Sequence, residues 1–149
     1  MNRFLPDVNA ILPLLDPLHV HHDSAHYWYK LNSPLQLIMC SHVENGVIRV
    51  ASQPKYPNSL GTSGKVREVL QQFTQKLQTE STKHDVSLLD DGVLVNPEML
   101  TPSRVSDLYL LAPAASNKAR LATFDQRIPA SAVVGGVKAL ELIPVISST

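Results

Sequence analysis

Two short apolar runs that each end on an aspartate constrain the fold more than any other feature of this sequence. In the first run Phe4 and Leu5 precede Asp7, and a segment with helical character begins near Asn9. In the second run, Arg120 to Asp125, an apolar stretch again ends on an acid. In open parallel sheets the functional crevice lies at the carboxyl ends of the strands. The pattern therefore predicts two parallel strands that bring two carboxylates to one edge of a sheet.

Strand-like and helix-like stretches alternate along the rest of the chain. The clearest helix is 65–78, where apolar residues recur at the i, i+3, i+4 and i+7 spacing of one helical face. Such alternation is typical of a parallel sheet covered by helices on both faces. We therefore expect one α/β domain over residues 1–149 with a sheet of about five strands, placed at 3–8, 35–40, 85–89, 120–125 and 137–143.

Local signals predict how several of these elements begin and end. Asn9 is a candidate N-cap for the first helix, because its side-chain oxygen can accept from a nearby amide. Ser41 with Glu44 three residues later matches a capping box. Residues 79–84 are polar and are predicted to connect the long helix to the next strand. Pro113 should kink or stop the helix that follows residue 106.

The composition excludes several broad classes. Thirteen basic and thirteen acidic side chains give zero net charge, which gives no support to a large phosphate-binding surface. The single cysteine, Cys40, follows an apolar run and is expected to lie in the core of a protein from a reducing compartment. Pro6 and Asp7 interrupt the N-terminus before a signal peptide could form, and no apolar run approaches the length of a membrane span. We expect a cytoplasmic protein with no membrane partner.

Four carboxylates are candidates for one shared site: Asp7, Glu44, Asp107 and Asp125. The first and last follow predicted strands, and the other two lie in first turns of predicted helices, which collect at the same sheet edge. Two carboxylates about 4 Å apart repel by roughly 4 kcal/mol at an effective dielectric of about 20. The cluster thus requires protonation or a cation, and hard oxygen ligands favour Mg²⁺ or Mn²⁺. A metal-bound water aimed by a carboxylate is a nucleophile for phosphodiester cleavage.

Each of these residues also has a purely structural explanation. Asp7 fits a turn or a helix cap. Glu44 fits the capping box, and Asp107 is favoured in a first helical turn by the helix dipole. A different metal site is suggested by His22 and His26, which are four residues apart, but no third ligand follows at a clear spacing.

An ordered series of motifs resembles the PIN-domain ribonucleases of the VapC toxin type. The resemblance runs from Phe4 to about Pro144, and no single motif decides it. The residues that carry it are Leu5-Pro6-Asp7-Val8-Asn9, Asp16 to His22, Val43 to Val50, Ser106 to Ala112 and Leu121 to Asp125. The resemblance implies a three-layer α/β/α domain that binds Mg²⁺ or Mn²⁺ and cuts RNA. It also implies a homodimer and a cognate antitoxin that inhibits the toxin.

The resemblance assigns roles to individual residues. The acidic quartet of the family corresponds to the four carboxylates named above, of which Asp7 and Asp107 are implied as direct metal ligands. Glu44 and Asp125 would orient metal-bound water or a second ion. The polar residue after the first acid corresponds to Asn9, and the hydroxyl before the last acid to Thr123. A rim of arginines is expected to contact phosphate: Arg3, Arg49, Arg104 and Arg127. Pro113 departs from the family pattern, which puts the path of its helix in question.

Other functions are compatible with parts of the sequence. A phosphatase of the haloacid-dehalogenase type would use Asp7 as a nucleophile, but it requires a second aspartate where this chain has Asn9. A receiver domain requires a lysine at the end of the last strand, where Ile143-Pro144 stands. A degenerate PIN domain that binds RNA or a protein without cutting is the non-enzymatic alternative, and the presence of all four acids argues against it.

Overall fold

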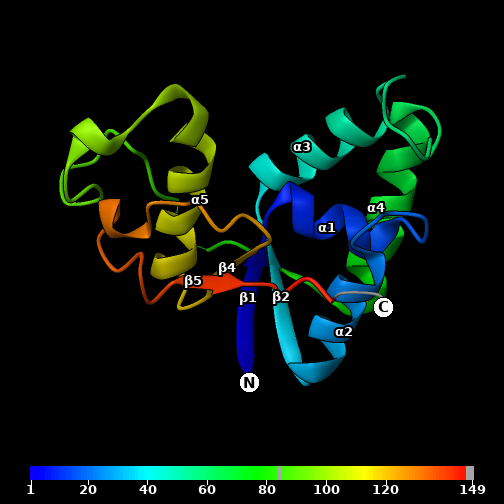
Figure 1. The fold of residues 1–149 in the computed structure, drawn as a ribbon, viewed down its shortest axis with the longest axis horizontal. Helices are drawn as coiled ribbons and strands as arrows, with labels where there is room; N and C mark the ends of the chain where they lie inside the picture. The colour runs from blue at the N-terminus through cyan, green and yellow to red at the C-terminus, as the bar shows by residue number, and fades with distance from the viewer. Residues whose placement is uncertain (84, 147–149) are drawn as a thin grey trace.

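The centre of the computed structural model is a parallel five-stranded sheet in the order β3-β2-β1-β4-β5 (Figure 1). The structure describes residues 1–83 and 85–146. The sheet confirms the predicted parallel α/β class. Its strands are β1 (Asn2–Pro6), β2 (Leu35–Met39), β3 (Glu80–Ser81), β4 (Arg120–Thr123) and β5 (Leu140–Leu142).

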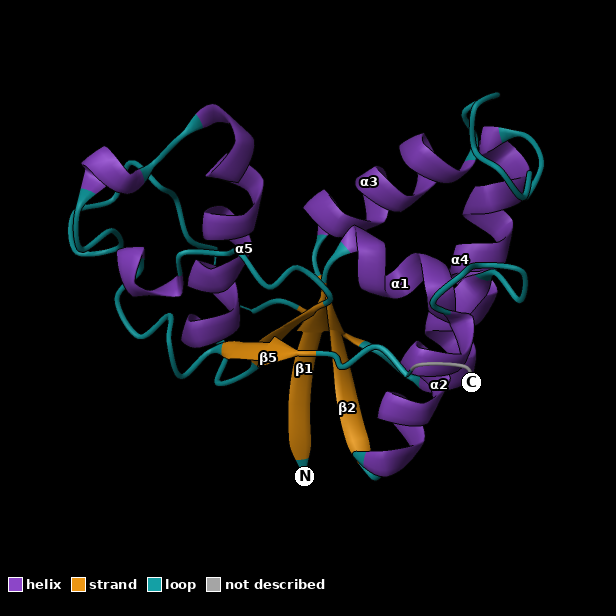
Figure 2. Ribbon diagram, viewed as in Figure 1, coloured by secondary structure: helices purple, strands orange, loops and turns teal. Residues whose placement is uncertain are grey.

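Helices cover both faces of this sheet and complete a three-layer α/β/α arrangement (Figure 2). Helices α3, α4 and α5 contribute buried side chains to the apolar cluster on one face of the sheet, whereas α2 contributes Trp28 to the cluster on the other face. Within the described residues, none of the helices has the length and apolar character needed to cross a membrane. The α-helices are α1 (Val8–Leu15), α2 (His22–Leu31), α3 (Ser41–Ala51), α4 (Ser63–Leu77) and α5 (Val105–Ser116).

The strand order places a topological switch point at β1. The chain moves outward from β1 through β2 to β3, and then returns to the other side of β1 to form β4. Strand β1 therefore pairs with β2 on one edge and with β4 on the other, with Leu5 opposite Leu121. In open α/β sheets, ligands bind outside the carboxyl ends of the strands at such a point. Two of the candidate acids lie at this point, because Asp7 follows β1 and Asp125 comes shortly after β4.

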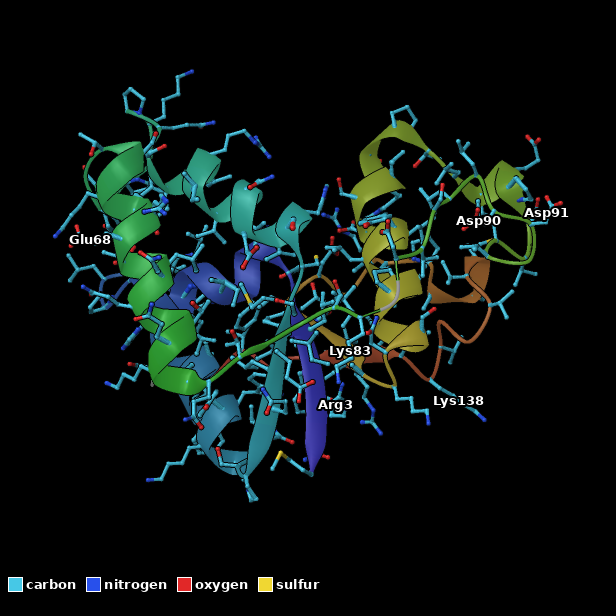
Figure 3. All side chains as sticks on the ribbon, turned by 180° about the vertical axis from the view of Figure 1, so that it is seen from behind. Arg3, Glu68, Lys83, Asp90, Asp91 and Lys138 are labelled. Atoms are coloured by element: carbon cyan, nitrogen blue, oxygen red, sulfur yellow. The ribbon has the colours of Figure 1, made fainter. Side chains whose placement is uncertain are left out.

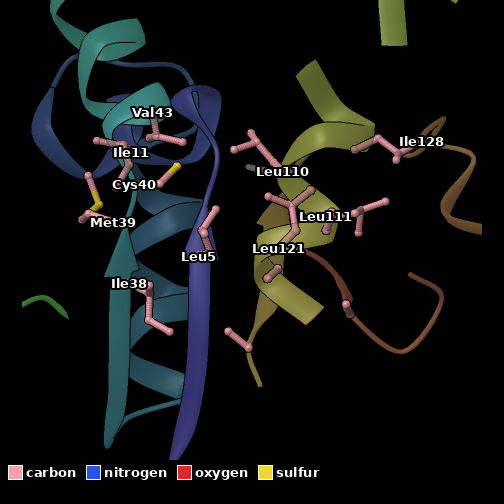
Figure 4. Packing of buried hydrophobic residues seen from close by; sticks show 14 of the residues in the cluster. Leu5, Ile11, Ile38, Met39, Cys40, Val43, Leu110, Leu111, Leu121 and Ile128 are labelled. Carbon is pink, nitrogen blue, oxygen red and sulfur yellow. The ribbon is translucent and has the colours of Figure 1, made fainter. Parts of the chain in front are cut away.

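Alternate residues of the inner strands pack on the two faces of the sheet. Leu5 and Leu121 belong to a large apolar cluster that also contains Leu111 of α5 (Figure 4). Phe4 belongs to a second cluster with Trp28 of α2. Burial of one such side chain stabilises the fold by about 1.5–3 kcal/mol. Cys40 is buried in the first cluster, which confirms its predicted place in the core.

The third strand lies earlier in the chain than the sequence predicted. Residues 85–89 form no strand, and the polar pair Glu80–Ser81 instead pairs with Ile38 and Met39 of β2. This strand is two residues long and lies at the sheet edge, so it needs no apolar alternation and leaves little signal in the sequence. The predicted connector included His84, which lies outside the described residues. The last strand is also shorter than 137–143, because residues 137–139 form a turn.

Two predicted helix caps are wrong. Asp7, not Asn9, caps α1: its backbone is extended, and its side chain accepts from the amide of Ala10 at 2.9 Å. Helix α3 begins at Ser41 itself, with Cys40 as N-cap and no side-chain cap hydrogen bond. The capping-box explanation of Glu44 is therefore removed.

Pro113 does not stop α5, which continues to Ser116. The helix end is closed by Asn117, whose backbone N–H and side-chain amide both donate to the carbonyl oxygen of Pro113, at 2.9 and 2.7 Å. These bonds satisfy a terminal carbonyl that a helix end otherwise leaves unpaired. The expected stop is thus wrong, and the helix carrying Asp107 is intact.

The histidine pair on α2 serves the end of α1. His22 Nδ1 lies 2.8 Å from the carbonyl oxygen of Pro13, and His26 Nε2 lies 3.2 Å from that of Leu14. Ring N–H groups of this kind satisfy the carbonyls at a helix C-terminus. The geometry therefore favours a structural role over the metal site that the spacing allowed.

Asp16 is the centre of a buried polar cluster that fixes the loop after α3. Only 1% of Asp16 is exposed, and its carboxylate accepts from Tyr56 Oη at 2.6 Å, Asn58 Nδ2 at 2.9 Å and the amide of Leu18 at 3.0 Å. Burial raises the pKa of Asp16, but these hydrogen bonds outweigh it and hold the pKa below its ordinary value. Tyr56 is thereby a structural anchor of the loop.

Candidate active site

Asp7 lies at the carboxyl end of β1 and is almost completely enclosed. It is 8% exposed, and its own amide donates to the carbonyl oxygen of Ala122 on β4 at 3.1 Å. Its side chain caps α1 through Ala10 and accepts a hydrogen bond from the Thr123 hydroxyl. The switch point of the sheet thus fixes both the backbone and the side chain of this residue.

Burial raises the pKa of the Asp7 carboxyl from 3.8 to about 6. The bonds from Thr123 and Ala10 oppose this shift, whereas the nearby negative charges of Asp107 and Asp125 add to it. A carboxyl shifted in this way by burial and by like charges is typical of a functional site. The same effect shows that the three acids are electrostatic neighbours.

Thr123 connects two of these acids. Its side chain is fully buried at the end of β4, where its hydroxyl donates to Asp7 and its oxygen accepts from the backbone N–H of Asp125 at 3.1 Å. A hydroxyl provides one donor and also acceptor capacity, so it can hold both groups at once. The sequence pointed to this residue through the family resemblance alone, and the structure gives it a local role.

Arg104 bridges the other two acids of the cluster. Its Nη1 lies 3.0 Å from Asp107 Oδ2 and 2.8 Å from Asp125 Oδ2, so one nitrogen serves both carboxylates. The pKa of Asp125 lies below its ordinary value, mainly because its carboxylate accepts a hydrogen bond from the Arg127 amide and also because it accepts one from the Arg104 side chain. Burial of Asp125 opposes this shift. The guanidinium therefore supplies positive charge at the point where the sequence argument required a cation.

An open depression of about 360 Å³ lies in front of these groups. Asp7 and Asp107 face it from α1 and α5, and Asn45 and Arg49 line it from α3. Helix α3 approaches closely because residue 46 is glycine: a Cβ there would lie 2.7 Å from Val8 Cγ2. Asn45 was missed by the sequence argument, because nothing in the sequence showed which face of α3 meets α1.

The structure gathers three of the four predicted acids and leaves Glu44 outside their depression. Glu44 is half-buried and lines a neighbouring depression with Arg67 and Gln71 of α4, and Asn45 borders both depressions. Asn9 lines the 360 Å³ depression as predicted for a residue next to the site. Among the residues that the structure describes, no three acid, histidine or cysteine side chains are arranged as a metal-binding group.

Only some of the arginines predicted to form a rim lie beside the acidic cluster, and their contact with phosphate stays a prediction. Arg49 lines the depression, and Arg127 Nε lies 3.7 Å from Asp125 Oδ1 with a largely exposed side chain. Arg3 is not at the site, because it pairs with Glu80 at 3.1 Å beside β1 (Figure 3). Residue 3 precedes the start of the crevice by most of the length of a strand, which explains why proximity in sequence to Asp7 was misleading.

Comparison with known proteins places this arrangement in a family. No family model matches the chain. It is 37% identical to ribonuclease VapC44 of Mycobacterium tuberculosis over 136 residues, which cover 91% of this chain and 95% of the relative. It is 34% identical to ribonuclease VapC38 of the same organism over 122 residues, covering 81% and 84% of the two chains.

A solved structure supports the same fold. The VapBC2 complex of Rickettsia felis, bound to a DNA fragment from its promoter, contains a chain that matches with a TM-score of 0.57 at 15% identity, covering 85% of this chain and 93% of that chain. At this identity the match shows the fold alone. Together with the extended sequence identity to two VapC ribonucleases, it shows that the chain belongs to the VapC family of PIN-domain ribonucleases.

Proposed function

We propose that this protein is the toxin of a toxin–antitoxin pair and hydrolyses RNA phosphodiester bonds with the help of Mg²⁺ or Mn²⁺. The observation that carries the proposal is the gathering of Asp7, Asp107 and Asp125 at the switch point of the sheet. Family membership supplies the reaction class, since the matched relatives are named ribonucleases. The geometry supplies the groups that such a reaction requires.

The donor set fits a hard divalent cation. Asp7 and Asp107 present carboxylate oxygens to one depression, and their mutual repulsion is relieved when a cation is bound. A cation held by these two residues would lower the pKa of a bound water and neutralise charge on the phosphate. Arg104 donates to one oxygen of Asp107 and to one of Asp125, so a cation that took up those same oxygens would displace at least part of this bridge.

The remaining groups position substrate and water. Thr123 keeps Asp7 oriented, and Asp125 is held in place by the same hydroxyl, from where it can accept a proton from the attacking water. Arg49 and Arg127 provide positive charge at the borders of the acidic cluster for a phosphate backbone. We assign Glu44 a supporting role, because it lies on the adjoining turn of α3 beside Asn45.

We further propose that a cognate antitoxin controls the protein and that the toxin forms a homodimer in the cytoplasm. The antitoxin is supported by the fold match to a protein that was solved as a VapBC complex. The non-catalytic alternative, a degenerate domain that binds RNA or protein, shares the fold and differs in having no turnover. Cleavage assays separate the two.

Asp107→Asn should abolish Mn²⁺-dependent RNA cleavage. We expect a loss of about 100-fold or more, the scale observed when a group that stabilises transition-state charge is removed. Asp91→Asn is the matched control, because Asp91 lies in the outer loop before α5 (Figure 3) and should cleave like the wild type. The measurement is cleavage of a labelled single-stranded RNA with Mn²⁺ or with EDTA. Undiminished cutting by the Asp107 variant, or cutting that persists in EDTA, would overturn the proposal.

Arg104→Gln should make the site bind Mn²⁺ more tightly. The guanidinium and a divalent cation compete for the same carboxylates, so removal of the guanidinium should strengthen Mn²⁺ binding by at least about 5-fold. Without a cation, the melting temperature should fall, because the repulsion between Asp107 and Asp125 is no longer balanced. Titration calorimetry and thermal melting measure the two effects. The control is Arg120→Gln, which removes a surface pair with Glu141; equal Mn²⁺ affinity in both variants would show that Arg104 does not compete.

A further inference from the structure

A second open groove, of about 600 Å³, adjoins the acidic cluster, and its aromatic wall has no role in the proposed mechanism. It shares Thr123 and Asp125 with the cluster, so it begins where the acids end. Its other walls come from the turn between α1 and α2 and from the loop that follows β4. The lining residues outside the acidic cluster are Asn9, His19, Val20, His21, Phe124, Gln126 and Arg127.

Aromatic rings form one wall of this groove. The rings of His21 and Phe124 are stacked, with centroids 4.9 Å apart and planes inclined by 18°. His19 continues the row, 5.8 Å from His21 at 39°. The pair joins two rings from distant parts of the chain at the border of the acidic cluster. A flat ring surface next to a phosphodiester-cleaving site is suited to a nucleobase.

The rings are held in place before any ligand arrives. Phe124 directly follows β4 and packs against the apolar cluster that contains Trp28. The amide of His21 donates to His19 Nδ1 at 3.0 Å, which fixes the turn between α1 and α2. A platform that is already ordered loses little conformational entropy when a ligand stacks on it.

Exposed apolar and cationic groups border the same wall. Val20, between the two histidines, is 85% exposed, although a valine gains nothing from contact with water. The Arg127 side chain is 84% exposed, and the residue is held over the acids through the bond from its amide to Asp125 at 2.9 Å. The wall thus offers a stacking surface, an apolar contact and a positive charge within one groove.

We propose that this groove binds the base of the nucleotide adjacent to the scissile phosphate in single-stranded RNA. The base stacks on the His21–Phe124 pair, and Arg127 contacts the neighbouring phosphate. The inference rests on the proposed ribonuclease function and adds to it the subsite that holds the substrate.

The test uses an oligouridine that carries a single 2-aminopurine, whose fluorescence is quenched when the base stacks on a protein ring. Titration with the full-length protein in EDTA measures binding without cleavage. Truncation of the ring in His21→Ala should weaken binding by about 10-fold and reduce the quenching, since a base–aromatic stack contributes about 1–3 kcal/mol. His21→Phe should restore both. His26→Ala is the matched control, because His26 is an exposed histidine of α2 that lies outside the groove.

The outcomes separate this subsite from the catalytic proposal. Quenching by the wild type that is lost in His21→Ala and recovered in His21→Phe supports the subsite, whether or not Mn²⁺ later produces cleavage. If His21→Ala quenches the 2-aminopurine as strongly as the wild type does and still cuts RNA with Mn²⁺, the subsite proposal is wrong and the proposed nuclease function is unaffected. Equal losses in His21→Ala and His21→Phe also overturn it, because they show a structural effect of the turn rather than stacking.

Discussion

Asp7→Asn should produce a protein that is more stable than the wild type and inactive as a nuclease. At pH 8, without divalent cations, we expect the free energy of unfolding to rise by about 1–3 kcal/mol, because the buried charge is removed. Asparagine retains an oxygen for the Ala10 amide and still fits beside Thr123. Cleavage should fall by about 100-fold or more. Urea denaturation and the RNA cleavage assay measure the two effects.

The sign of the pH dependence follows from the pKa of Asp7. The folded pKa is about 6, above the ordinary value of 3.8, so the folded protein retains its proton more strongly than the unfolded chain does. This group therefore has no destabilising effect below about pH 4, and its cost grows as the pH rises to about 6 and then stays constant. The stability gained by Asp7→Asn should be small at pH 4 and full above pH 7.

Mn²⁺ provides the complementary measurement. Because only the wild type carries the full set of carboxylates, Mn²⁺ should raise its melting temperature and raise that of Asp7→Asn much less. If Asp7→Asn is less stable than the wild type at pH 8, the ionised Asp7 carboxylate does not destabilise the fold, and the explanation by burial is wrong. Asp91→Asn, which changes an exposed acid, should alter neither stability nor the response to Mn²⁺.

Asp16→Ala should cause a large loss of stability although Asp16 lies outside the acidic cluster. We expect about 2–4 kcal/mol, because the Tyr56 hydroxyl, the Asn58 amide and the Leu18 N–H all lose their acceptor. Urea denaturation at neutral pH measures the loss. Asp23→Ala on α2, which removes an exposed acid of the same kind, is the control.

The pH dependence of this second effect has the opposite sign. The folded pKa of Asp16 lies below its ordinary value, so its contribution is present above about pH 4 and is lost as the pH falls through the folded pKa. The difference in the free energy of unfolding between Asp16→Ala and the wild type should therefore become smaller at acid pH. A loss under 1 kcal/mol at neutral pH would show that the cluster is solvated and that the loop has other anchors.

The fold was largely predictable because its main signals are local. The apolar runs that precede Asp7 and Asp125 mark strands, and their parallel pairing follows from the helices between them. The edge strand at Glu80 could not be found, since two polar residues that pair on one side leave no periodic pattern. The sequence left the cap of α1 open between Asp7 and Asn9, because both residues have the same capping chemistry and Asn9 lies closer to the apolar helical residues.

The site was less predictable than the fold because its geometry depends on long-range packing. The bridge from Arg104 to Asp125 joins two elements whose approach is decided by the packing of α5 against β4, and no local pattern reports it. Thr123 and Asn9 were assigned by family resemblance, and the structure now gives both a place beside the acids. The metal ligands stay a prediction, and so does the role of Glu44.

The crossover from β3 to β4 determines when the acidic cluster can assemble. Asp7 precedes its partners along the chain, and the groups that surround it are complete only after α5 and β4 have been made and have docked beside β1. Contacts between distant parts of a chain form late, because a long loop must first be closed. The acidic cluster therefore cannot assemble on the nascent chain before β4 has been made, and a proteolytic cut that releases β4 and β5 should disperse it.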